Sequence, residues 1–154
     1  MLKKISYVVL FFILTTSCGY KKINQDEIMI HIQNISVEGD KRTAFKLKNN
    51  ILLISNKNAN DKYDLELTIE DNKTSKIKNS AGRITRYNKK ITVNLTLKGV
   101  SQEKSIKKLF SKSGDFEVEK VHTDTIANER NVSENIVKQL SDQITNFIIF
   151  FARN

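Results

Sequence analysis

The residue with the most distinctive chemistry in this chain is its only cysteine, Cys18. The chain begins with Lys3 and Lys4, followed by the apolar run Ile5–Leu14 and by small residues up to Ser17. A basic start, a short apolar run and small residues are typical of a removable secretion signal. A run of ten residues reaches only about 15 Å as a helix, half of a hydrocarbon core of about 30 Å. Because Cys18 directly follows the small residues, we expect bacterial processing to cleave before it and to attach lipid to its thiol.

Two other interpretations of this N-terminus stay open, a plain secretion signal with an incidental cysteine and an uncleaved anchor. Leu14 stands four residues before Cys18, and Thr15 occupies the usual Leu position of a lipid-attachment motif. An exported chain with one cysteine cannot form an internal disulfide, which favours a thiol that is consumed by modification. Gly19 follows the cysteine, and by the sorting rule of enteric bacteria this residue predicts the periplasmic side of the outer membrane. We therefore expect a signal peptide over residues 1–17 and a single domain over 18–154, tethered to the membrane through lipid.

The second chemical feature is a concentration of positive charge in residues 73–112. This segment holds twelve Lys and Arg residues against Glu103 alone, a net charge of +11, whereas the whole chain carries +9. A bias of the genome toward Lys codons explains a high isoelectric point, but not the confinement of the charge to forty residues. A local field of this sign attracts phosphate and other polyanions. The segment therefore predicts an anionic partner.

Residues that could form a catalytic or metal-binding constellation are missing from the sequence. His31 and His122 lie in different predicted elements, and Cys18 is the only candidate thiol. No HExxH motif, Gly-rich phosphate loop or Cys/His cluster with metal-ligand spacing occurs. We expect a protein that is not an enzyme and holds no cofactor or metal, with an enzyme built on Asp, Glu and Lys alone as an alternative. Nucleic-acid binding would suit the basic segment, but the export signal argues against it.

The elements that position these residues can be predicted from hydrophobic periodicity. Alternation over Ile28–Ile32 predicts a strand that Gly39-Asp40 breaks. A helix is expected over residues 43–54, with Thr43 as its N-cap and Phe45 on its apolar face. Residues 63–70 predict a second strand, after which residues 71–80 are expected to link it to a third.

The third strand is expected over residues 85–97, with a polar half, Arg83–Lys90, beyond the core. A fourth strand is expected within Ser105–Val118, and a helix of about five turns with one apolar face should start at Asn131 or Ser133. The order is therefore strand, helix, three strands, helix. It predicts an α+β two-layer sandwich of about four mostly antiparallel strands, covered on one face by two helices. The other face would need a partner or a mostly polar surface, and the polar sides of the strands permit both.

This chain resembles the lipopolysaccharide-assembly lipoprotein family LptE over almost its whole length. Four segments in the family's order carry the resemblance: Ser17-Cys18-Gly19-Tyr20, YDLELTIEDN, AGRITRYNKKITVNLTL and GDFEVEKVHTDTIANERNVSENIVKQLSDQI. Membership would imply a two-layer domain that plugs the lumen of the outer-membrane barrel LptD, helps it assemble and assists lipopolysaccharide transport to the cell surface. A polar sheet face would suit the polar interior of a large barrel.

The resemblance also gives the basic segment a ligand, because lipopolysaccharide carries phosphates that Arg and Lys can bind. On this basis we expect lipopolysaccharide or barrel contacts from the polar end of the third strand first and from the fourth strand second. These residues are Arg83, Arg86, Lys89 and Lys90, followed by Lys107 and Lys108. Cys18 would carry acyl chains such as palmitate and hold the domain beside its barrel. The alternative function is a periplasmic lipoprotein adaptor or pilotin for another envelope complex.

Overall fold

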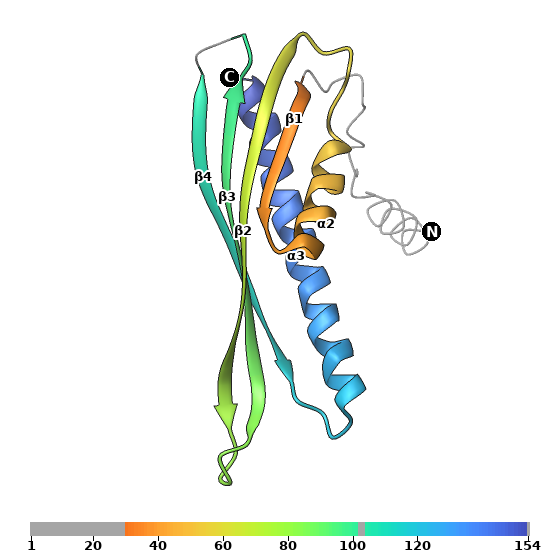
Figure 1. Ribbon diagram of the computed structural model, residues 1–154, viewed down its shortest axis with the longest axis vertical. Helices are drawn as coiled ribbons and strands as arrows, with labels where there is room; N and C mark the ends of the chain where they lie inside the picture. Colours follow the sequence, from red (N-terminus) through yellow and green to blue (C-terminus); the bar gives the residue numbers. More distant parts are fainter. Residues whose placement is uncertain (1–29, 102–103, 154) are drawn as a thin grey trace, which may run out of the picture.

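A computed structural model of the protein describes residues 30–101 and 104–153, which form one sheet with helices on one of its faces (Figure 1). Cys18 and the predicted signal peptide lie outside the described residues. The elements run in the order β1 (Ile30–Gly39), α2 (Lys41–Leu52), β2 (Asp61–Lys78), β3 (Ile84–Gly99), β4 (Ser105–Glu117) and α3 (His122–Arg153). This order and the α+β two-layer arrangement confirm the predicted fold.

The sheet has the strand order β1-β2-β3-β4, so β1 and β4 form its edges. β1 pairs with β2 in parallel, and α2 provides the crossover that a parallel pair requires. The other two pairs are antiparallel and are joined by short connections. The sheet is therefore mostly antiparallel, as predicted.

The core lies between the sheet and the two helices. The inward residues of β2 and β3 alternate along each strand and are at most 3% exposed: Leu65, Leu67, Ile69, Ile91, Val93, Leu95 and Leu97. α2 contributes Leu47 and Ile51, and α3 contributes Leu140, Ile144 and Ile148, all fully buried. Strand side chains alternate between the two faces of a sheet. The strand residues that lie between the inward ones therefore form an outer sheet face, which points away from the helices. That face is polar and solvent-accessible, which is one of the two alternatives that the sequence left open.

The start of α2 differs from the prediction in two ways. Its N-cap is Asp40, whose Oδ1 accepts a hydrogen bond of 2.8 Å from the backbone N–H of Thr43. Thr43 is not the cap and is instead buried within the first turn. Phe45 was expected on the buried face, but it is 67% exposed.

Gly39, which ends β1, allows this sharp transition into α2. Its φ is +107°, and a Cβ atom there would lie 1.9 Å from the carbonyl oxygen of Ile69 in β2. A side chain at this position would therefore clash with backbone as well as strain the chain.

β2 and α3 are both longer than predicted. β2 runs through Asp71 to Lys78, because its polar residues continue the ladder with β3. α3 begins at His122 rather than near Asn131, and Ser133 lies inside it, donating a hydrogen bond of 2.8 Å to the Glu129 carbonyl. Figure 1 shows that α2 covers only the upper half of the sheet, whereas α3 runs along most of its length. Within the described part of the chain, neither helix is long and apolar enough to cross a membrane.

Candidate ligand-binding surface

Arg83 lies in the loop at the tip of the long β2–β3 hairpin, and its side chain is exposed. The side chain of Asn79 shapes this loop: its Oδ1 accepts hydrogen bonds of 3.1 Å from the N–H of Ala81 and 2.9 Å from the N–H of Arg83. The backbone of Arg83 also accepts from the N–H of Asn79 at 2.9 Å. The loop therefore presents Arg83 to solvent from a hydrogen-bonded turn.

The outer sheet face carries three of the other predicted residues, Arg86 and Lys90 in β3 and Lys107 in β4. Lys90 pairs with Ser113, and Lys107 pairs with Thr96, six positions further along β3. At about 3.3 Å per residue this places the two lysines roughly 20 Å apart along the strand. Both are exposed, and neither forms an ion pair with any residue in 30–101 or 104–153. They can contact separate anionic groups, but not one phosphate together.

The acidic end of β4 neutralises part of the hairpin's charge. Glu117 pairs with Arg86, and Asp115 pairs with Lys76. Asp115 also accepts a hydrogen bond of 2.7 Å from the Asn88 side chain. The hydrogen bond from Asn88, followed by that from Lys76, lowers the pKa of Asp115 below its ordinary value. These contacts fasten β4 to the hairpin, so Arg86 is engaged within the sheet.

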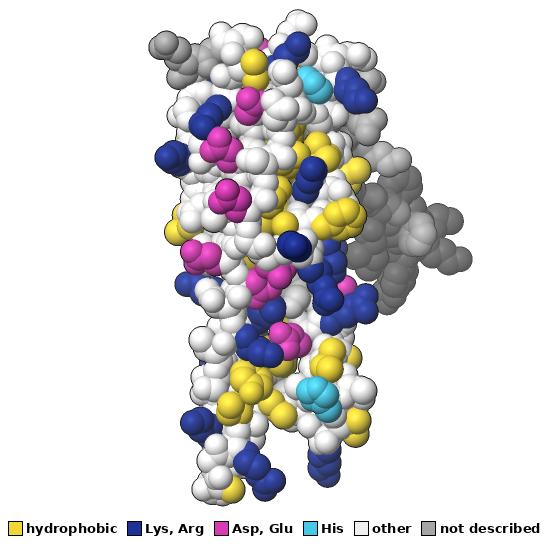
Figure 2. Space-filling view, viewed as in Figure 1, with side chains coloured by type: hydrophobic (Ala, Val, Ile, Leu, Met, Phe, Trp, Pro, Cys, Tyr) yellow, Lys and Arg dark blue, Asp and Glu magenta, His cyan; other side chains and the backbone are white. Residues whose placement is uncertain are grey.

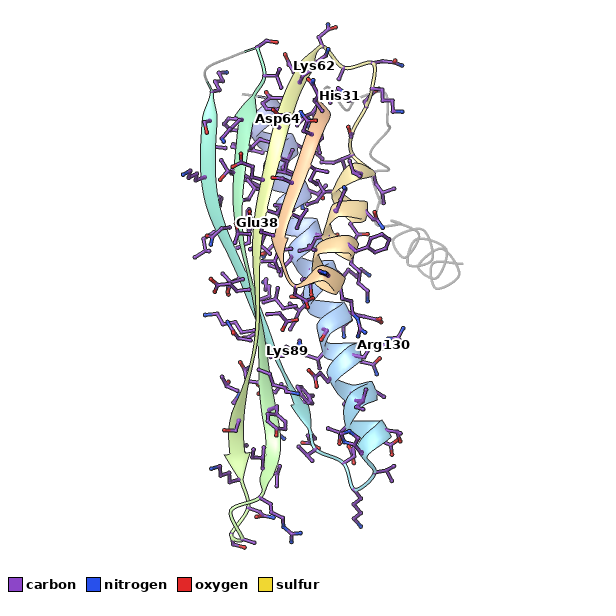
Figure 3. The ribbon with its side chains drawn as sticks, viewed as in Figure 1. His31, Glu38, Lys62, Asp64, Lys89 and Arg130 are labelled. Atoms are coloured by element: carbon purple, nitrogen blue, oxygen red, sulfur yellow. The ribbon has the colours of Figure 1, made fainter. Side chains whose placement is uncertain are left out.

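Lys89 faces the helices and lies in an internal charge cluster, defined here as Asp71, Lys73, Lys89 and Glu129. Its Nζ is 2.9 Å from Asp71 Oδ1 and 3.3 Å from Glu129 Oε1, and its side chain is only 12% exposed. Lys73 completes the cluster at 2.9 Å from Glu129 Oε2. Figure 3 shows Lys89 between the strands and α3. Lys89 therefore joins the hairpin to α3 rather than presenting its charge to solvent.

The pKa values of Lys89 and Glu129 favour the charged forms of these two residues. Burial lowers the pKa of Lys89, but the interactions with Asp71 and then Glu129 outweigh it, so the pKa is raised above its ordinary value. Burial raises the pKa of Glu129, but hydrogen bonds from Lys73 and Lys89 outweigh it, so that pKa is lowered. The cluster is a stable ionic bridge at neutral pH.

Aromatic rings contact two lysines of this region, Lys73 and Lys108. Tyr87 and Phe116 stack at a centroid distance of 5.5 Å, and Lys73 Nζ lies 5.2 Å from the centre of the Tyr87 ring. Lys108, the last of the predicted contact residues, has its Nζ 4.4 Å from the centre of the Phe147 ring. A cation at this distance from a ring is attracted to its face. Lys108 is thus held against α3.

The sequence interpretation did not single out Asp71, Lys73 or Glu129. A signal for the first two is nevertheless present, because Asp71 and Lys73 continue the inward alternation of Leu65 to Ile69. Charged residues at inward positions need partners of opposite charge. The partner of Asp71 is Lys89 of the neighbouring strand β3. The partner of Lys73 is Glu129, which only the additional first turns of α3 bring over the hairpin.

A cleft of about 870 Å³ lies above this cluster, between the start of α2, the sheet and α3. Its walls include the basic residues Lys46 and Arg130, and both pair with Glu134, at 3.0 Å and 3.1 Å. Lys41 and Arg42 also line the cleft and form no ion pair with a described residue, so the charges of the cleft are only partly paired. Among residues 30–101 and 104–153, no group of three or more His, Cys, Asp or Glu side chains could hold a metal ion.

Comparisons of sequence and structure show what the chain is similar to. No model of a known protein family matches the sequence, and no curated protein matches it. Solved structures do match the fold. Rare lipoprotein B from Shewanella oneidensis is similar with a TM-score of 0.57 and 16% identity, covering 79% of this chain and 97% of its own.

Two further solved structures have the same arrangement. A putative lipoprotein from Caulobacter crescentus matches with a TM-score of 0.56 and 12% identity, over 84% of this chain and 94% of its own. An uncharacterized lipoprotein B from Nitrosomonas europaea matches with a TM-score of 0.50 and 12% identity, over 88% and 93%. At these identities the likeness shows that the chain shares its fold with these three lipoproteins.

Proposed function

We propose that the protein is a non-catalytic outer-membrane lipoprotein that plugs an LptD-type barrel and assists lipopolysaccharide transport. The main support for this proposal is the outer sheet face. It forms one whole side of the sheet, yet it is polar along nearly its full length. Figure 2 shows acidic and basic side chains interspersed over the strands with few hydrophobic ones. A face of this kind suits the polar lumen of a large barrel. The fold shared with rare lipoprotein B and two other lipoproteins supports the same assignment.

Lipopolysaccharide phosphates would contact the cations that the described structure leaves without acidic partners. Arg83 at the hairpin tip and Lys90 and Lys107 on the outer sheet face meet this condition. Arg86, Lys89 and Lys108 would not contact the ligand themselves. Their interactions within the protein hold the hairpin and β4 in place. Arg83 can bind a phosphate in a bidentate manner, whereas each lysine acts as a point charge.

Charge reversal tests the ligand part of this proposal. Arg83→Glu/Lys90→Glu should weaken lipopolysaccharide binding by about tenfold or more at moderate salt, since each cation near an anionic surface contributes about 1 kcal/mol. Lys57→Glu/Lys138→Glu is the matched control, because both lysines are exposed, lie away from the hairpin and give the same change of charge. Equal binding by the two double variants would contradict the assignment.

Co-purification from outer membranes tests the partner part. The native chain should recover a large barrel protein, and this recovery should persist in the Arg83→Glu/Lys90→Glu variant if the ligand and barrel contacts are separate. Recovery of a secretin in place of an LptD-type barrel would instead support the adaptor or pilotin function.

A further inference from the structure

The outward face of α2 has a composition unlike that of the rest of the surface. The helix carries four Lys and Arg residues and no Asp or Glu. Thr43, Leu47 and Ile51 point into the core. At 100° per residue, the opposite side of α2 and the residue after it present an outward face made of Lys41, Arg42, Phe45, Asn49, Leu52 and Leu53.

Apolar side chains at the centre of this face are exposed. Phe45 is 67% exposed, Leu53 is 72% exposed and Leu52 is 38% exposed. Figure 2 shows hydrophobic side chains over α2 with Lys and Arg side chains beside them. Lys46, at the border of the face, is already paired with Glu134, whereas no described acidic residue pairs with Lys41 or Arg42.

We propose that this outward face of α2 is a docking surface for an anionic lipid bilayer. A helix face that combines an aromatic ring, leucines and cations without acidic residues binds the headgroup region, where apolar groups are buried and cations meet lipid phosphates. Charge complementarity therefore selects an anionic bilayer. The face also points away from the sheet, so docking leaves the outer sheet face and the hairpin tip accessible.

The predicted lipid on Cys18 makes this second contact effective. Eleven residues separate Cys18 from Ile30, and a chain of this length spans at most about 40 Å when fully extended. α2 therefore stays within reach of the bilayer that holds the anchor. Because the anchor keeps the α2 face close to the bilayer at a high effective concentration, even a weak contact between the two is sufficient. The inference stands independently of the proposed barrel partner.

Tryptophan fluorescence can test the docking surface, because the chain contains no Trp. Phe45→Trp places a single probe on the α2 face, and Leu53→Trp places a second probe there in case the first variant folds poorly. Leu109→Trp is the matched control, since Leu109 is an apolar residue that is 60% exposed in β4. The full chain, produced and processed in a Gram-negative host, is reconstituted into phosphatidylcholine vesicles with and without phosphatidylglycerol, with bromine on the acyl chains as quencher.

The α2 probes should be quenched several-fold more than the Leu109→Trp probe in the anionic vesicles, and their emission should shift to the blue. Adding Lys41→Glu/Arg42→Glu should return the quenching at position 45 to its value in neutral vesicles. Equal quenching of the α2 and β4 probes would overturn the proposal, as would quenching that does not depend on phosphatidylglycerol. Emission that shifts only in samples retaining a barrel protein, without quenching by bromine, would also overturn it and assign the face to a protein contact.

Discussion

Replacing Lys89 by Met is expected to destabilise the domain far more than removing an exposed lysine. The Lys89 ammonium bridges Asp71 and Glu129, and the Lys89 and Asp71 side chains are only 12% and 15% exposed. Breaking a buried pair by removing one partner costs about 3–5 kcal/mol, because a buried charge stays uncompensated. Lys73 still neutralises Glu129 in the variant, so the expected loss of unfolding free energy is lower, about 2–3 kcal/mol.

Lys98→Met provides the matched control for this substitution. Lys98 Nζ is 2.7 Å from Glu66 Oε1, closer than Lys89 is to either of its partners, but both side chains are half exposed. Exposed pairs contribute about 0–1 kcal/mol, so Lys98→Met should change stability by less than that. The shorter ion pair, Lys98–Glu66, is expected to contribute less to stability than the longer but buried contacts of Lys89. The comparison therefore tests whether burial or distance determines the contribution of an ion pair.

Urea unfolding at pH 7, followed by far-ultraviolet circular dichroism, measures both variants. With a slope of about 1–3 kcal/mol per molar urea, Lys89→Met should lower the midpoint by roughly 0.7–3 M. Adding Asp71→Asn should recover part of the loss, since the unpaired carboxylate is then removed. The reasoning is refuted if Lys89→Met costs no more than Lys98→Met, or if the Lys89 and Asp71 substitutions are strictly additive.

Three further predictions use the same unfolding assay. Gly39→Ala should cost more than about 3 kcal/mol or prevent folding, because its Cβ would overlap the Ile69 carbonyl; a normal midpoint would disprove the φ assigned to Gly39. Leu140→Ala should cost about 2–5 kcal/mol, since Leu140 is fully buried, and a loss under 1 kcal/mol would contradict that burial. The folded-state pKa of Glu129 is lowered, so its contribution is present above the unfolded pKa and is lost as pH falls through the folded value. Glu129→Gln should therefore weaken the loss of stability that occurs as the pH falls below the ordinary glutamate pKa of 4.5. An unchanged loss of stability at acid pH would argue against the cluster.

Period-two patterns made the sheet predictable from sequence. Leu65 to Ile69 and Ile91 to Leu97 alternate with polar residues, and each strand pairs over those positions. The polar continuation of β2 past Asp71 was missed because no apolar alternation marks it. Backbone hydrogen bonds with β3 extend the strand over these residues instead. Such pairing cannot be inferred from the residue pattern of one strand alone.

The helix starts were harder to predict, for a physical reason. The first turns of α3 bear one large apolar residue, Ile126, and that residue is 52% exposed. These turns do not pack on the core, so they show no apolar stripe. At α2 the capping residue, Asp40, immediately follows the glycine that ends β1, and the Gly-Asp pair was interpreted only as a strand break. Both misses arise where local hydrogen bonds, rather than burial, determine the backbone.

The candidate contact residues could be located by charge but not sorted by role. Sequence places Lys89 and Lys90 side by side, yet one is held in the internal charge cluster and the other is exposed. Strand alternation implies that the two point to opposite faces. α3 reaches Lys89 on the inner face of the hairpin because the helix begins at His122. The sequence pattern did not indicate this early start.

The position of β4 at the edge of the sheet has a consequence for solubility. Its thirteen residues leave one side of the backbone without a strand partner in the described structure, and such an edge can template pairing with a second molecule. Lys107 and Lys112 lie along this edge at positions facing opposite sides of the sheet. Two copies that met edge to edge would bring these like charges together on both faces. The lysines of β4 therefore oppose aggregation of a long, regular edge strand, whether or not they also bind an anionic ligand.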